Sequence, residues 1–108
     1  MAERDVVVLT KYQLSRATDT VRNMARRLGV NYAIWPHVRE IMDGTKIDPI
    51  DVADWLARAN VQDVLEMVGF TRYRLVPDEQ NDEITGMTVA IHDEHLTIEI
   101  MALRVKER

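Results

Sequence analysis

A chain of 108 residues suits one domain, here residues 1–108, with a single hydrophobic core. Apolar residues make up 46% of it and charged residues 30%, a balance that excludes disorder of the whole chain. The net charge of −4 is unusual for a nucleic-acid-binding protein, and the lack of cysteine excludes disulfides, thiolate nucleophiles and cysteine metal sites and fits a cytoplasmic protein.

Four helical segments are expected before Gly69. They cover residues 11–28, 36–43, 49–59 and 61–68, and residues 5–9 are β-branched enough for a short strand in front of them. Apolar residues recur at spacings of three and four through the first segment, which Gly29 ends. Pro36 suits the first turn of the second helix, Asp48 caps the third and Asn60 caps the fourth.

After Gly69 the apolar residues follow a period of two. This alternation predicts a three-stranded antiparallel β-meander at 70–76, 86–92 and 95–104. One face of such a sheet packs on the helices and the other faces water or a partner. The expected fold class is therefore α+β, with about four helical segments followed by the meander.

The second hairpin of the meander has a predicted register. A two-residue turn at 93–94 places Val89 opposite Ile98 on the buried face. The same register places Thr88 opposite Glu99 on the other face. A four-residue loop with the same register is equally acceptable, because the turn sequence is not one that favours a tight hairpin.

The sequence carries no catalytic signature. Ser15, the only serine, lies on a helix without a glycine elbow, and there is no glycine-rich phosphate-binding loop. His92 and His95 are weak candidates for metal ligands, since a hairpin brings them to one side, but no recognised third ligand accompanies them. We therefore expect no catalytic residue, no bound metal and no cofactor.

The last strand is apolar on both faces. Met101, Leu103 and Val105 lie, by parity, on the face opposite the core residues of that strand. If the strand is a sheet edge, this row invites pairing with another protein or with a second copy, which predicts a homodimer. Alternatively, the N-terminal run 6–9 covers the row.

A basic first helix suggests a second class of partner, nucleic acid. Residues 24–30 resemble the centre of a helix-turn-helix motif, with Ala25, Gly29 and Trp35 at the expected spacing. The resemblance covers about twenty residues, and Pro36 departs from it because it falls inside the second helix of such a motif. The resemblance implies contacts with phosphates and base edges. The residues concerned are Arg16, Arg22, Arg26, Arg27 and Asn31.

Two functions rank highest from the sequence, and a small enzyme or a metal-binding protein comes third. The first is a non-enzymatic protein-interaction module, a small adaptor, inhibitor or assembly protein that docks to a protein partner and self-associates. The alternative is a DNA-binding regulator that uses the basic first helix and a degenerate helix-turn-helix-like turn at Gly29. No membrane association is expected, and the compact size also suits a phage or mobile-element protein.

Overall fold

The computed structural model describes residues 11–107, which form an α+β fold with three helices and a five-stranded mixed sheet. The helices are α1 (Lys11–Arg26), α2 (Pro36–Thr45) and α3 (Pro49–Leu56). The strands are β1 (Asn31–Ile34), β2 (Asn60–Met67), β3 (Phe70–Val76), β4 (Ile84–His92) and β5 (Thr97–Val105), with a 3-10 turn η1 (Asp93–His95) before β5. The strand expected at 5–9 lies outside the described residues.

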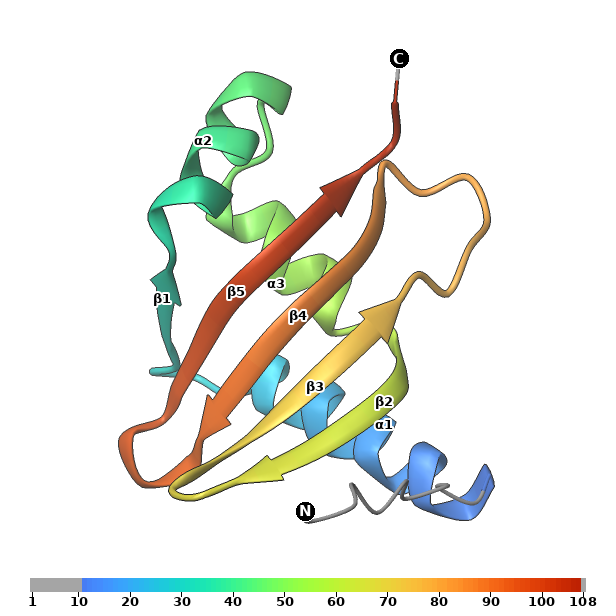
Figure 1. Ribbon diagram of the computed structural model, residues 1–108, viewed down its shortest axis with the longest axis vertical. Helices are drawn as coiled ribbons and strands as arrows, with labels where there is room; N and C mark the ends of the chain where they lie inside the picture. Colours follow the sequence, from blue (N-terminus) through green and yellow to red (C-terminus); the bar gives the residue numbers. More distant parts are fainter. Residues whose placement is uncertain (1–10, 108) are drawn as a thin grey trace, which may run out of the picture.

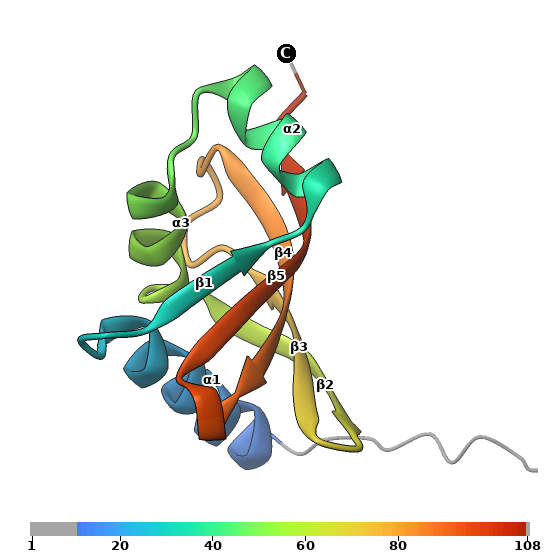
Figure 2. The same ribbon diagram turned by 90° about the vertical axis from the view of Figure 1, so that its left-hand side faces the viewer.

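The helices and the sheet form two layers with one core between them. Figures 1 and 2 show α1 and α3 against the same face of the sheet, and α2 at the end of the sheet near β1 and β5. The fully buried side chains at the centre of this interface include Trp55, Leu56, Leu75, Met87, Ile98 and Ile100. Among the described residues, no helix is long and apolar enough to cross a membrane.

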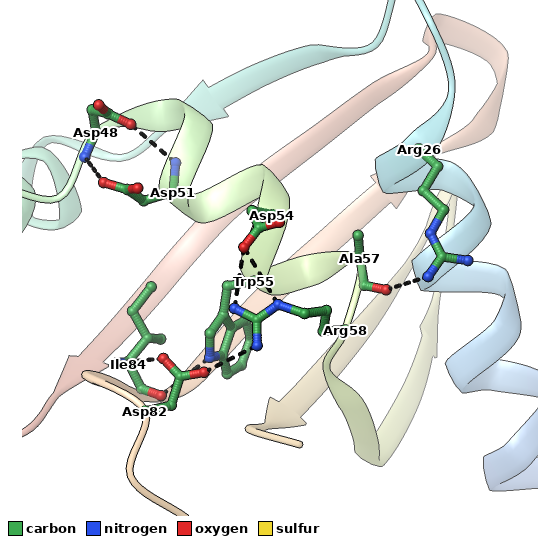
Figure 3. Close-up of polar contacts among 9 residues, drawn as sticks. All are labelled: Arg26, Asp48, Asp51, Asp54, Trp55, Ala57, Arg58, Asp82 and Ile84. Carbon is green, nitrogen blue, oxygen red and sulfur yellow. Dashed lines mark hydrogen bonds and ion pairs between the residues drawn. The ribbon is translucent and has the colours of Figure 1, made fainter. Parts of the chain in front are cut away.

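The first three helices confirm their sequence signals. Trp35 is extended just before α2, so Pro36 takes the first helical position, where its missing N–H costs nothing. At the start of α3 the side chain of Asp48 accepts a hydrogen bond from the N–H of Asp51 at 3.0 Å. The side chain of Asp51 in turn accepts one from the N–H of Asp48 at 3.1 Å (Figure 3). The buried Trp55 then donates from Nε1 to the carbonyl of Ile84 at 3.1 Å, which joins α3 to β4.

The prediction of a fourth helix at 61–68 is wrong, because most of these residues belong to strand β2. A bulge between Val61 and Asp63 is the cause. Val61 pairs with Leu75 and Val64 with Tyr73, so two residues three positions apart both reach the core face. A strand with a bulge thus mimics the apolar spacing of a helix, and pairing with β3 determines the structure instead.

The prediction of a three-stranded meander is also wrong, because β1 and β2 extend the sheet to five strands. The order is β1-β5-β4-β3-β2, with β1 parallel to β5 and the other pairs antiparallel. β1 is a four-residue strand in which Tyr32 and Ile34 turn toward the core. So short a segment shows little alternation, and its partner lies at the far end of the chain.

The predicted register of the β4–β5 hairpin is wrong by two residues. Val89 lies opposite Ile100 and not Ile98, which pairs with Ile91. The turn takes four residues, since η1 is followed by Leu96 in the left-handed region at φ 46°. Because a shift of two leaves every side chain on its face, Ile98 and Ile100 remain buried as expected.

A second irregularity reverses the parity at the end of β5. Val89 pairs with Ile100 and Thr88 with Ala102, so Met101 is the extra residue of a bulge. Beyond it Leu103 turns into the core and is only 5% exposed. The expectation that Leu103 shares an outward row with Met101 is therefore wrong.

Replacing Ile98 with alanine should lower the free energy of unfolding by about 2–5 kcal/mol, because it leaves a cavity in a close-packed core. Chemical denaturation measures the loss. Ile50→Ala is the matched control, since that isoleucine is 77% exposed and its truncation should change stability by no more than about 0.5 kcal/mol. An equally small loss for Ile98→Ala would contradict the burial.

Candidate interaction surface

One face of the sheet points away from α1 and α3 (Figure 2) and is called here the uncovered face. Residues paired across neighbouring strands point to the same side of a sheet. Pairing therefore defines one row that crosses all five strands. Its members are Leu65, Arg72, Ala90, Glu99 and Ala33.

A hydrogen-bonded row of aromatic and acidic side chains lies on this face. Trp35 donates from Nε1 to Oε2 of Glu99 at 2.6 Å, and Nε2 of His92 lies 3.1 Å from Oε1 of the same carboxylate. The ring of Phe70 packs on His92 with 5.3 Å between the ring centroids. The row thus links the end of β1 to β5, β4 and β3 and fixes the position of each ring.

The carboxylate of Glu99 is stabilised in its charged form. The hydrogen bond from Trp35 lowers the pKa of Glu99 most, and the hydrogen bond and the charge of His92 lower it further, against a smaller opposing effect of burial. A carboxyl whose pKa is lower in the folded than in the unfolded state stabilises the fold above its unfolded pKa. That contribution disappears as the pH falls through its folded pKa.

Glu99→Gln should therefore be less stable than the wild type at pH 7, by less than about 1 kcal/mol because the site is partly exposed. The difference should shrink as the pH falls from the ordinary glutamate pKa of about 4 through the lowered pKa of Glu99 in the folded state, below which the carboxyl is protonated in both states. Urea denaturation of both proteins between pH 7 and pH 3 measures it. A difference independent of pH would contradict the role of the charge.

Three arginines share the uncovered face. Arg72 and Arg74 lie two residues apart on β3, and Arg104 on β5 pairs with Gly86 on β4. The guanidinium of Arg104 lies across Gly86, since a Cβ at that position would come within 2.7 Å of its Cζ. A larger residue at position 86 would therefore displace the Arg104 guanidinium from its present position.

An apolar patch adjoins these arginines at the β2–β3 hairpin, formed by Leu65, Met67, Val68 and Phe70 and called here the hairpin patch. Leu65 and Met67 are 43% and 45% exposed, and Val68 is 100% exposed at the turn. Gly69 completes the two-residue turn at φ 89°. Beside the patch lies a depression of about 490 Å³, lined by side chains of Met67, Phe70, His92 and His95 among others.

The long outer edge of the sheet is capped at two points. β2 is an outer strand, and the N–H of Val61 donates to Oγ1 of Thr18 on α1 at 3.0 Å. The N–H of Val64 donates to Oδ1 of Asp63 at 3.0 Å. Such caps, together with the bulge, oppose the addition of a strand from another molecule. The other outer strand, β1, has only four residues.

Two of the arginines predicted to bind nucleic acid instead hold the fold together. Arg22 donates to the carbonyls of Ala59 and Arg58, each at 2.9 Å, and to Oδ1 of Asn60 at 2.9 Å. Arg26 donates to the carbonyl of Ala57 at 2.9 Å (Figure 3). These carbonyls follow the end of α3, where a helix leaves acceptors without partners and favours positive charge.

The remaining predicted nucleic-acid residues do not form a helix-turn-helix site. Asn31 begins strand β1, so the second helix of such a motif is absent where the resemblance placed it. Arg16 lies over the ring of Tyr12 at 5.9 Å from its centroid, and Arg27 is exposed after the end of α1. The structure therefore separates these residues rather than directing them to one surface.

The two histidines predicted as weak metal ligands both line the depression beside the hairpin patch, where His92 contacts Glu99 and His95 lies in η1. Among the side chains that the structure describes, no three His, Asp or Glu residues form a group that could hold a metal ion. The predicted self-association residues do not form an exposed row. Met101 and Val105 are partly buried on β5, which is paired on both sides and is not the expected edge.

Comparison of the chain with models of protein families, with curated proteins and with solved structures found no match. The function of the protein must therefore be inferred from its own surface. The alternation of Phe70, Arg72 and Arg74 is visible in the sequence, so one strand of the uncovered face could have been recognised. The contribution of Trp35 could not, because it depends on strand β1.

Arg22→Ala should lower the free energy of unfolding by about 1.5–3 kcal/mol, because it removes charged hydrogen bonds to carbonyls at the end of α3. Arg27→Ala is the matched control, since Arg27 is exposed and its loss should cost no more than about 0.5 kcal/mol. Thermal and urea denaturation measure both. Equal stability of the two variants would show that Arg22 does not anchor α1.

Proposed function

We propose that the chain is a non-enzymatic protein-interaction module, a small adaptor, inhibitor or assembly protein that docks through the uncovered face of its sheet. The hairpin patch carries the proposal. Single exposed apolar residues are common on soluble proteins, but adjacent ones rimmed by polar groups are typical of interaction sites. Here Leu65 and Met67 share one face with Phe70, and Val68 extends the patch at the turn. A cytoplasmic location belongs to the same proposal.

A second copy of the chain is one candidate partner. Pairing through the outer strands is disfavoured, because the N–H groups of Val61 and Val64 on β2 already have acceptors. Contact between two uncovered faces, with the hairpin patch at the centre, is the arrangement that would bury the exposed apolar side chains. We do not propose nucleic-acid binding by α1, since Arg22 and Arg26 are engaged at the end of α3.

Met67→Glu should abolish binding of the partner while leaving the fold intact, because it places a charge in the hairpin patch at a residue that is already 45% exposed. The measurement combines light scattering at about 100 μM, where a micromolar homodimer is populated, with affinity capture from cells of the source organism.

Ile50→Glu is the matched control for this variant, since Ile50 is 77% exposed on α3 and away from the uncovered face. It should dimerise or capture the same partner as the wild type. A partner that binds wild type and both variants equally would contradict docking through the hairpin patch.

A further inference from the structure

Arginine side chains outnumber carboxylates on the uncovered face. Among the side chains that the structure describes, no ion pair joins Arg72, Arg74 or Arg104 to a carboxylate. Two carboxylates lie on the same face, Glu99, which accepts from Trp35 and contacts His92, and Asp63, which lies opposite Arg74 and accepts from the N–H of Val64. Both keep their charge, so the three guanidinium groups leave a small excess of positive charge for a ligand.

The spacing of these groups suits carboxylates on an extended chain. Arg72 and Arg74 lie on one side of β3, two residues apart, which is a separation of roughly 7 Å along a strand. Alternate residues of an extended partner segment have the same spacing. A guanidinium donates two parallel hydrogen bonds to a carboxylate, so two such pairs would fix both the position and the direction of the segment.

Aliphatic side chains beside the arginines decide the class of partner. Leu65 pairs with Arg72 across the β2–β3 hairpin, and Met67 pairs with Phe70. Leucine and methionine favour apolar side chains, whereas a nucleic acid would offer phosphates and planar bases. A ligand that matches both the charge and the apolar patch is a protein segment with acidic and apolar residues.

We infer that the uncovered face binds an acidic, amphipathic protein segment in extended form, with carboxylates at Arg72 and Arg74 and an apolar residue on the hairpin patch. This inference rests on the proposed function and specifies the chemistry of the partner. Phe70 of the hairpin patch packs on the ring of His92, which in turn contacts Glu99. The segment therefore meets a surface whose side chains are already ordered, which lowers the entropic cost of binding.

The test uses a fluorescein-labelled peptide of twelve residues, in which two leucines precede three glutamates at alternate positions, and measures fluorescence anisotropy. Arg72→Gln and Arg74→Gln should each weaken binding about tenfold, as expected for the loss of a charged hydrogen bond. Arg27→Gln is the matched control, since Arg27 is exposed just after the end of α1, which packs on the opposite face of the sheet. A peptide with glutamine in place of glutamate should bind more weakly by a similar factor.

Two results would overturn the inference. The first is no binding of the acidic peptide at about 100 μM protein in low salt, well above micromolar dissociation constants. The second is tighter binding of a twelve-nucleotide oligothymidylate, with the same dependence on Arg72 and Arg74, which would assign the face to single-stranded nucleic acid. If the peptide fails while capture of a partner still depends on Met67, the proposed function stands and only the acidic partner is rejected.

Discussion

The arrangement of the two layers depends on the attachment of α1 to the junction between α3 and β2. Arg22 and Arg26 supply donors to the carbonyls that follow α3, and Thr18 accepts from the first part of β2. These groups would otherwise be partnerless acceptors and an open strand edge. With α1 held there, Val21 and Met24 complete the core beneath the sheet. Two guanidinium groups of the helix are thus engaged by backbone carbonyls of the same molecule.

The junction also explains which parts of the fold could be predicted. Two local signals were confirmed: the capping pair of Asp48 and Asp51 and the proline at the start of α2 formed as expected. The errors occurred where strand pairing overrides local pattern. A bulge in β2 gave an apolar spacing of three, and a bulge at Met101 reversed the direction of Leu103. Neither bulge has a local sequence signal, because each follows from the strand opposite.

Only part of the candidate surface could be predicted, because most of it depends on pairing between distant strands. The alternating residues of β3 could be assigned to two faces from the sequence, and Arg72 and Arg74 fell on the outward one. Their neighbours on that face came from strands whose register or existence was not predicted, including Glu99 and Trp35. A binding surface assembled across five strands is therefore visible only when all pairings are known.

The outer edge of the sheet and its uncovered face differ in what they offer to a partner. Along β2, Asp63 and Thr18 occupy backbone donors that another strand would need. Across the face, by contrast, Leu65 and Met67 stay exposed. A partner can thus be recognised through side chains, which carry specificity, while the indiscriminate hydrogen bonding of strand edges is blocked.

The parallel pairing of β1 with β5 has a consequence for how the molecule is made. Asn31 pairs with Thr97 and Ile34 with Ile100. Strand β1 therefore cannot pair until β5, which lies more than sixty residues later in the sequence, is present. During synthesis from the N-terminus, α1, β1 and α2 emerge long before β5 can join them. Pairings between distant segments carry a high cost in chain entropy and slow folding. The sheet can close around β5 only after residues 97–105 have been synthesised, and until then Tyr32 and Ile34 have no strand beside them.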